Sequence, residues 1–581
     1  MNLLADRAAE FPERIALADA ERKWTWAQLH AESRMIAGRL QREHGILPGD
    51  VVATVLENSA EHVFILHAIF LCGAAAAPLN LRLSPPERER QLAHLHPRLL
   101  IAAENAAFEN VQFVQSGLLF TQEREAIDQE NRAPERGAID QEHSKSETEE
   151  SASDPGLHLD AGRQLAHGRS ALEYHELPPD ESRVCSILFT SGSSGVMKAV
   201  PHSWRNHRSS AEGSAANLGV REDDNWLCII PLYHIGGLAI VTRSLIYGTA
   251  MTIQQGFEAS AVLETLRRVS ITLLSVVPTM LQRLIDVDRD FAAASLPALR
   301  AILLGGAAAS QRLWEEALAR KLPVLGTYGL TETCSQVVTA SPDAQLSATG
   351  SAGRAIAGAE IRIRHERGES ESAGEAKEST SAIAVGESNE TAVSPFARGE
   401  SGESESGESE FAESEFAESE FAGEAGEICI RGGMVTEGYF RNPSLTAERF
   451  VDGWFLTGDI GVIDADGWLH VLGRGDDMIV TGGENVYPTE IEDVLLRHPA
   501  VTDAAIAGVE DAAWGMSIAA LVVLKESVDF AELETWCRAE LAGYKIPRNW
   551  RSVDEIPRTA SGKLIRGRIV GMWEEVKGSK S

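Results

Sequence analysis

Ile187-Leu-Phe-Thr-Ser-Gly-Ser-Ser-Gly-Val-Met-Lys198 carries the strongest structural signal in the chain. An apolar run typical of a buried strand passes directly into hydroxyl and glycine residues, and a lysine follows. Small residues let backbone N–H groups approach phosphate oxygens, hydroxyls donate hydrogen bonds, and lysine adds a positive charge. The pattern indicates a phosphate-binding loop, although a flexible surface turn has a similar composition. It is not a Walker A loop, because Met197 and Ala199 flank the lysine.

Short apolar runs of strand-like character recur on both sides of this loop, with helical stretches between several of them. The predicted strands span residues 51–56, 183–189, 226–230, 271–276 and 299–304, and the predicted helices include 24–43 and 261–268. Alternating strands and helices predict an α/β fold with largely parallel sheets. Residues 63–79 are the most apolar stretch, but they are few for a membrane span and indicate a buried helix that runs into a strand.

The pattern changes after Gly473. Residues 478–483 predict a strand and a glycine turn, 489–496 and 530–541 predict helices, and 504–509 and 519–524 predict strands. These elements form an α+β unit of about 100 residues, which is an ordinary size for a separate domain.

Two polar segments interrupt the alternating pattern. Residues 121–179 contain Ala-Ile-Asp-Gln-Glu twice, and 366–424 contain 17 glutamates, three basic residues and a recurring Glu-Phe-Ala. Such compositions bury too little apolar surface to offset chain entropy, so both are predicted to be disordered or weakly ordered insertions. The second lies between two alternating runs, 361–364 and 427–431, that predict a pair of strands.

Charge and cysteine content exclude several classes of protein. The chain of 581 residues has 53 basic and 86 acidic residues, which predicts no nucleic-acid partner. Its six cysteines form no C-x-x-C pair and match no zinc or disulfide pattern, which favours reduced thiols in the cytoplasm. The first residues lack the pattern of a signal peptide, and the sequence leaves a homo-oligomer possible.

Three further motifs follow the glycine-rich loop in order: Tyr328-Gly-Leu-Thr-Glu-Thr333, then Gly453-Trp-Phe-Leu-Thr-Gly-Asp459 with Arg474, and Pro557-Arg-Thr-Ala-Ser-Gly-Lys563. Together the four resemble the motifs of the adenylate-forming superfamily, which includes acyl-CoA synthetases, nonribosomal-peptide adenylation domains and luciferases. The resemblance covers nearly the whole chain except the two insertions. It implies a large N-terminal domain (1–475) of layered, mostly parallel sheets and helices with a small β-barrel part. A small, mobile α+β C-terminal domain (476–581) would follow, with Asp476 at the hinge.

The resemblance also implies a role for each matching residue. ATP phosphates would be held by Thr190, Ser191, Gly192, Ser193, Ser194, Gly195 and Lys198. The adenine would be framed by Gly305, Gly306, Ala307 and Tyr328, and the ribose hydroxyls bound by Asp459 with Arg474. Thr331 would contact phosphate, Glu332 would bind Mg2+, Lys563 would bridge the carboxylate and the α-phosphate, and the loop around Gly483 would line the path of coenzyme A.

These groups suit the chemistry of carboxylate activation. A carboxylate that attacks the α-phosphorus of ATP gives a mixed anhydride and pyrophosphate, and the thiol of coenzyme A then displaces AMP. Because two anions must meet, the site needs Mg2+ and lysine to offset their repulsion. No covalent enzyme nucleophile is required, and the chain has no Gly-x-Ser-x-Gly elbow.

Several stretches resemble the o-succinylbenzoate–CoA ligases of menaquinone biosynthesis more than other members. They are Asn206-His207 with Asn217-Leu-Gly219, Pro231-Leu-Tyr-His-Ile-Gly-Gly237, Val277-Pro-Thr-Met-Leu281, and the run Thr333-Cys-Ser-Gln336. Polar candidates for the acyl pocket are His234, His207, Thr279 and Ser335, of which His234 lies in a family motif.

Three other interpretations remain open. The protein could be an acyl- or aryl-CoA synthetase for a different acid, or a peptide-synthetase adenylation domain, although no carrier segment follows in the sequence. The acidic repeats could also belong to an interaction protein built on a silent ligase scaffold, against which the intact Lys198, Glu332, Asp459 and Lys563 argue. Pyrophosphate release with a panel of acids separates these interpretations.

Overall fold

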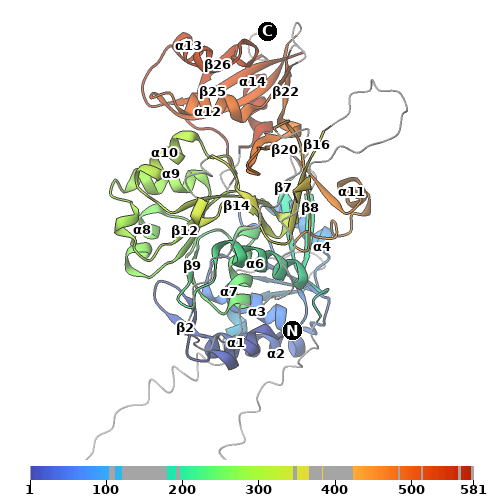
Figure 1. Cartoon of the computed structure of the whole chain (residues 1–581). Coiled ribbons are helices and arrows are strands. Elements are labelled where there is room, and N and C mark those ends of the chain that lie inside the picture. Colours follow the sequence, from blue (N-terminus) through green and yellow to red (C-terminus); the bar gives the residue numbers. More distant parts are fainter. Residues whose placement is uncertain are drawn as a thin grey trace, which may run out of the picture.

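The computed structural model describes residues 2–103, 112–120, 180–191, 197–344, 350–365, 382–383, 423–481, 484–511, 515–559 and 564–577. The segments predicted as insertions, 121–179 and 366–424, lie outside these ranges except for residues 382–383 and 423–424. Four sheets and their helices make up the described chain (Figure 1).

The largest sheet has nine strands in the order β15-β14-β13-β12-β11-β9-β10-β1-β2. They are β1 (Ile15–Ala18), β2 (Lys23–Thr25), β9 (Asn225–Cys228), β10 (Ala250–Ile253), β11 (Leu273–Val276), β12 (Ala301–Leu304), β13 (Val324–Leu330), β14 (Ser335–Thr339) and β15 (Arg354–Ala355). The neighbouring strands from β1 to β13 in this order pair in parallel, and the pairs β1–β2, β13–β14 and β14–β15 are antiparallel. Four helices connect successive parallel strands: α7 (Ile235–Tyr247), α8 (Ala259–Arg268), α9 (Pro278–Val287) and α10 (Gln311–Ala319). The predicted α/β alternation is confirmed.

A second sheet has the order β6-β5-β3-β4-β7-β8, with only β8 antiparallel to its neighbour. Its strands are β3 (Val51–Val55), β4 (Ala75–Pro78), β5 (Leu99–Ala102), β6 (Phe113–Gln115), β7 (Val184–Ser191) and β8 (Met197–Ser203). The accompanying helices are α1 (Leu3–Glu10), α2 (Trp26–His44), α3 (Ala60–Leu71), α4 (Pro85–Leu95) and α6 (Trp204–Leu218). One apolar core contains side chains of both sheets and of α2, α3 and α7, so the two sheets are parts of one body.

The prediction for residues 63–79 is confirmed, because α3 is almost wholly buried and leads into β4. Among the described residues, no helix has the length and apolar character that a bilayer crossing requires. All six cysteines are free, in agreement with the predicted reduced thiols, and all six are buried.

The third sheet is antiparallel and has the order β17-β16-β18-β20-β19, with β21 paired to β20. Its strands are β16 (Ala359–Arg364), β17 (Ala382–Ile383), β18 (Gly426–Gly432), β19 (Phe450–Val451), β20 (Trp454–Ile463) and β21 (Leu469–Arg474), and α11 (Pro443–Arg449) precedes β19. This sheet corresponds to the part expected as a small barrel. The predicted pair across the acidic segment is confirmed, since β16 and β18 pair in register from Ala359↔Gly432 to Arg364↔Glu427.

A separate α+β unit follows β21, at the top of Figure 1. Its strands are β22 (Ile479–Thr481), β23 (Glu484–Val486), β24 (Val501–Asp511), β25 (Gly515–Leu524) and β26 (Asn549–Ser552), and its helices are α12 (Pro488–Leu496), α13 (Phe530–Glu540) and α14 (Arg566–Lys577). Within the part of the chain that the structure describes, its apolar core contains no side chain from the other sheets, so this unit packs around its own interior. A short 3-10 turn, Gly475–Asp477, connects it to β21.

Candidate active site

The base of the predicted phosphate loop is an antiparallel strand pair. Thr190 on β7 is paired with Lys198 on β8, and Ser191 with Met197. Residues 192–196, which include the predicted Gly192, Ser193, Ser194 and Gly195, lie outside the described residues, as does the side chain of Ser191. The Oγ1 atom of Thr190 is buried and has no hydrogen-bond partner among the described residues. A buried hydroxyl without a partner at the mouth of this loop is suited to bind a phosphate oxygen.

Lys198 lies beside the predicted magnesium ligand, and an unpredicted tyrosine joins them. The Nζ atom of Lys198 is 5.8 Å from the ring centroid of Tyr439, and the Tyr439 hydroxyl donates to Oε1 of Glu332 at 2.9 Å. Burial, with a smaller effect of Arg449, lowers the pKa of Lys198. A partly desolvated lysine next to a carboxylate provides a strong, fixed positive field for an incoming anion.

Glu332 is fixed at its backbone as well as at its carboxylate. It lies in a 3-10 turn, Thr331–Thr333, and its carbonyl accepts from the backbone N–H of Thr436 at 2.9 Å. The described residues contain no group of three or more metal-binding side chains. One buried carboxylate fits Mg2+ that arrives with ATP, because Mg2+ commonly takes one or two protein oxygens and completes its shell with phosphates and water.

Two residues predicted to bind the nucleoside, Arg474 and Tyr328, contact the carboxylate of a third, Asp459. Arg474 Nε lies 2.7 Å from Asp459 Oδ1, and the Tyr328 hydroxyl donates to Asp459 Oδ2 at 2.7 Å. Burial and the Asp459 charge hold the pKa of Tyr328 well above its ordinary value, so the phenol remains a donor. Each carboxylate oxygen retains a lone pair, which leaves room for ribose hydroxyls.

The predicted adenine residues follow the end of β12. Gly305 is packed so closely that a Cβ atom would lie 2.6 Å from the Thr327 carbonyl oxygen, and Gly306 has a φ of 79°. Gly306 and Ala307 are exposed at this edge. The carboxyl ends of β12 and β13 therefore meet here, where ligands commonly bind in parallel sheets.

The residues predicted for the acyl pocket differ in their surroundings. His234 is half-buried at the N-cap of α7, with its ring centroid 4.6 Å from that of Tyr233. His207 is buried and lies 3.3 Å from the Cys334 sulfur. Ser335 has a φ of 104°, an uncommon conformation for a residue with a side chain, and Thr279 lies in the first turn of α9. Such a backbone outlier in a distinctive motif is typical of a functional segment.

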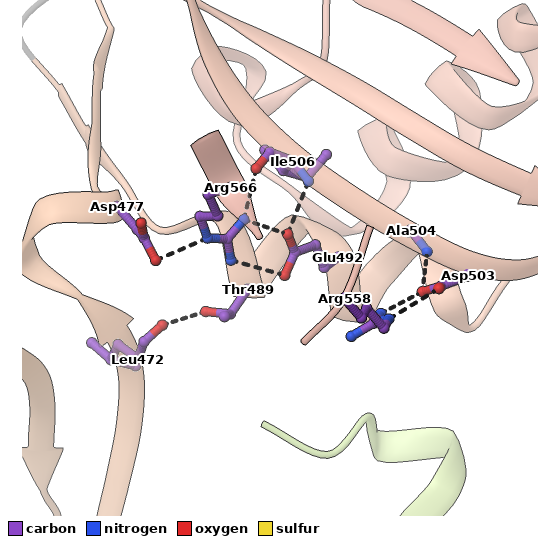
Figure 2. Close-up of polar contacts among 9 residues, drawn as sticks. All are labelled: Leu472, Asp477, Thr489, Glu492, Asp503, Ala504, Ile506, Arg558 and Arg566. Carbon is purple, nitrogen blue, oxygen red and sulfur yellow. Dashed lines mark hydrogen bonds and ion pairs between the residues drawn. The ribbon is translucent and has the colours of Figure 1, made fainter. Parts of the chain in front are cut away.

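The predicted Lys563 and Gly483 lie outside the described residues, but the base of the Lys563 loop is described. On one side Arg558 pairs with Asp503, Nη2 to Oδ1 at 2.6 Å. On the other Arg566 bonds to Asp477 at 2.9 Å and to Glu492 at 2.8 Å (Figure 2). The two arginines attach both ends of the loop to the C-terminal unit.

Among the described residues, two hydrogen bonds connect helix α12 of the C-terminal unit to the larger body. Thr489 on α12 donates to the Leu472 carbonyl on β21, which Figure 2 draws below Arg566. The backbone N–H of Gln311, in the first turn of α10, donates to Asp493 at 2.8 Å.

Comparison with known proteins defines the class first. The family model of the AMP-binding enzymes matches residues 4–378, and that of the AMP-binding enzyme C-terminal domain matches 490–563. The chain belongs to the AMP-binding enzyme family.

Two similar proteins and a similar solved structure share one enzyme name, the CoA ligase or synthetase of 2-succinylbenzoate, which is also written o-succinylbenzoate. The chain is 35% identical to 2-succinylbenzoate–CoA ligase of Bacillus licheniformis over 98% of this chain and 99% of that one. It is 36% identical to the ligase of that name from Geobacillus kaustophilus, over 98% and 97%. The structure of o-succinylbenzoate CoA synthetase from Bacillus subtilis with its acyl-adenylate intermediate matches with a TM-score of 0.76 and 33% identity, over 98% and 97% of the two chains. The complex of that enzyme with ATP and magnesium matches with a TM-score of 0.74.

Three residues that contact the predicted motifs were not predicted from the sequence. They are Tyr439, His202, whose Nε2 lies 2.6 Å from the Thr331 carbonyl oxygen, and Arg243, whose Nη1 donates to Gln336 at 3.3 Å. Tyr439 follows a glycine in an irregular stretch, and no local pattern distinguishes it from a core aromatic residue. Arg243 is the one charged residue of helix α7, which is otherwise mostly apolar, and a charged residue at such a position was the available signal.

Proposed function

We propose that this protein is an ATP-dependent ligase that converts 2-succinylbenzoate to 2-succinylbenzoyl-CoA. The reaction passes through an acyl-adenylate, releases pyrophosphate and AMP, and belongs to menaquinone biosynthesis in the cytoplasm. The observation that carries the proposal is the convergence of Lys198, Tyr439 and Glu332 near the Asp459–Arg474 pair, which matches one magnesium–nucleotide site. The similarity to 2-succinylbenzoate–CoA ligases supports the choice of acid.

In this proposal each group has its own task. Asp459, oriented by Arg474 and Tyr328, holds the ribose, while Thr190 and Lys198 bind phosphate oxygens. Mg2+, when bound through Glu332, offsets phosphate charge. The acid carboxylate then attacks the α-phosphorus, and the positive groups stabilise the charge that shifts to pyrophosphate.

Lys563 completes the first step in this proposal, and the chain divides at Asp476 into residues 1–475 and 476–581. The separate core of the C-terminal unit and its few polar contacts with the larger body support a rotation about the Gly475–Asp477 turn. Rotation would withdraw Lys563 and bring the loop around Gly483 to coenzyme A, with Asp476 as the hinge.

Arg243 is the residue we propose to bind the second carboxylate of the acid. Its guanidinium is buried, with Nη2 donating to Ser210 at 3.0 Å and Nη1 to Gln336 at 3.3 Å. Its Nε has no partner among the described residues, and no described carboxylate lies within ion-pair distance. Because an unpaired buried charge is costly, an anionic ligand group would be stabilised there.

A panel of acids tests this function. Among o-succinylbenzoate, benzoate, 4-coumarate and medium-chain fatty acids, only the first is expected to support efficient CoA-dependent AMP release. A monoacid leaves the buried polar groups unpaired, which can reduce kcat/KM by roughly 10⁴-fold. Arg243→Gln should remove most of this preference, and His234→Ala should weaken use of the acid more than binding of ATP. An equal kcat/KM for any monocarboxylic acid would instead support an acyl- or aryl-CoA synthetase of other specificity.

A further inference from the structure

A chain of buried hydrogen bonds connects the acyl side of the site to the magnesium motif. The Cys334 sulfur lies 3.3 Å from His207 Nδ1, and His207 Nε2 lies 2.9 Å from Ser186 Oγ. Ser186 Oγ lies 3.3 Å from His202 Nδ1, and His202 Nε2 lies 2.6 Å from the carbonyl oxygen of Thr331. All five residues except Thr331 are buried. Three belong to β7, β8 and α6, while Thr331 lies in the 3-10 turn and Cys334 directly follows it.

The direction of these hydrogen bonds follows from the one group that can only accept. The Thr331 carbonyl accepts, so His202 Nε2 carries a proton and donates. His202 Nδ1 then accepts from the Ser186 hydroxyl, whose oxygen accepts from His207 Nε2–H. Burial lowers the pKa of His202 to about 4, and it also lowers the pKa of His207, so both rings are neutral as this pattern requires.

We propose that His202 is a positioning residue that holds the Thr331–Thr333 turn, and therefore Glu332, in the geometry that binds magnesium and ATP. This inference rests on the proposed function. The turn needs external support, because Cys334 and Ser335 follow it with φ values of 52° and 104°. Positive φ values at two consecutive residues with side chains cost free energy and persist only where neighbouring contacts fix them.

Three contacts provide this support. Thr436 donates to the Glu332 carbonyl, Tyr439 donates to the Glu332 carboxylate, and His202 donates to the Thr331 carbonyl. His202 is the only one of the three that lies on β8, the strand that also carries Lys198. It therefore couples the position of the phosphate lysine to that of the magnesium carboxylate.

His62 provides a matched control. It is also buried, its pKa is also lowered to about 4, and it also makes two hydrogen bonds, to Thr54 Oγ1 at 2.9 Å and to the Glu57 carbonyl at 3.1 Å. Both of its partners are local and neither belongs to the nucleotide site. A substitution there reports the cost of removing a buried histidine without touching the magnesium motif.

The test compares His202→Leu, His202→Gln and His62→Leu in the full chain. We expect His202→Leu to raise KM for MgATP and to lower kcat of pyrophosphate release, with a combined loss of about 10- to 100-fold. A loss of about 10- to 100-fold corresponds to the free energy that is lost when one buried hydrogen bond is removed and its acceptor is left unpaired. His202→Gln, whose amide can donate to Thr331 and accept from Ser186, should stay within about threefold of the wild type, as should His62→Leu.

Two outcomes would overturn the inference: a loss in His202→Leu no larger than in His62→Leu, or an equal loss in His202→Gln and His202→Leu. If His202→Leu does not fold, Ser186→Ala removes the support of His202 instead, and an unchanged KM for MgATP in that variant also overturns it. Binding of MgATP measured by calorimetry needs no acid. It therefore decides on His202 even if the wild type activates none of the acids, a result that would refute the proposed function alone.

Discussion

The two ends of this active site are held by different kinds of interaction. On the large body, neutral hydrogen bonds fix the magnesium motif, and His202 and Ser186 are both 0% exposed. On the C-terminal unit, ion pairs fix the base of the Lys563 loop, and side-chain exposures are 26% and 28% for Arg558 and Asp503. The first kind is dry and neutral. The second is charged, and it is partly hydrated at Arg558–Asp503 but largely buried at Arg566–Glu492, where the exposures are 18% and 9%.

The difference suits two different tasks. A dry neutral network keeps its geometry because its buried members are hydrogen-bonded to one another and water does not compete for these bonds. Partly hydrated ion pairs keep a loop attached while its surroundings change, because water compensates the charges. We therefore infer that the large body supplies a fixed nucleotide site and that the C-terminal unit carries a lysine that can be presented and withdrawn.

Removal of that lysine has the largest expected effect. Lys563→Ala should abolish adenylate formation, with a loss of at least about 10²- to 10³-fold, because a charge that stabilises the transition state is lost. Thioester formation from pre-made acyl-adenylate should be largely spared. Lys525→Ala, an exposed lysine on the same unit, serves as the control and should change neither step. An equal loss in both half-reactions would contradict the assigned role.

Loss of the Arg566–Glu492 ion pair at the base of the Lys563 loop should have the next largest effect. Arg566→Gln leaves Glu492 buried without its partner, which should destabilise the C-terminal unit by about 3 kcal/mol. Arg538→Gln breaks an exposed i,i+4 pair with Glu534 and should cost no more than about 0.5 kcal/mol. Urea unfolding of both variants measures the two losses of stability. Equal unfolding midpoints would show that the buried ion pair stabilises the unit no more than the exposed one.

Acid should act on the neutral region through its buried histidines. Burial lowers the pKa of His62, His67 and His202 to about 4, below the unfolded value of 6.5. The unfolded chain therefore binds more protons, and stability falls as pH decreases from 6.5 towards 4. Each histidine should cost about 2 kcal/mol at pH 5 relative to pH 7.5. The slope of the unfolding free energy against pH is proportional to the number of protons taken up on unfolding. His62→Gln should lower that number by about one between pH 4 and 6.5, and an unchanged slope would contradict this account.

The smallest effect is expected from the acidic segment. Replacement of residues 366–424 by a short glycine-containing turn should change stability by less than about 1 kcal/mol, since closure entropy grows slowly with loop length. The replacement removes β17 but keeps the pairing of β16 with β18. Thermal unfolding and turnover of the shortened chain measure this, and loss of soluble protein would show that the segment packs or regulates.

Local patterns predicted the fold well where one signal dominates. Strands such as β3 and β12 are short apolar runs that a parallel sheet buries on both faces, and α2 shows helical spacing of its apolar residues. No such signal marks β8, because Met197–Ser203 mixes polar and apolar residues and the strand forms by pairing with β7. Strand pairing is a tertiary property that a linear pattern only partly encodes.

The candidate site was likewise predicted from the sequence only in part. Asp459, Arg474 and Glu332 stand in motifs and were predicted, and the structure brings the first two into contact. Tyr439 and His202 act through a hydroxyl and a ring nitrogen whose partners are more than 100 residues away in the chain. Neither residue has a neighbour in sequence that indicates its role, so only the fold reveals them.

Acid-dependent exchange of pyrophosphate into ATP, measured without coenzyme A, tests the central claim most directly. The account predicts that o-succinylbenzoate and Mg2+ suffice for exchange in the wild type, and that added coenzyme A then yields AMP and the thioester in equal amounts. No exchange with any acid in a protein that still binds ATP, or thioester formation with release of ADP and phosphate, would contradict it.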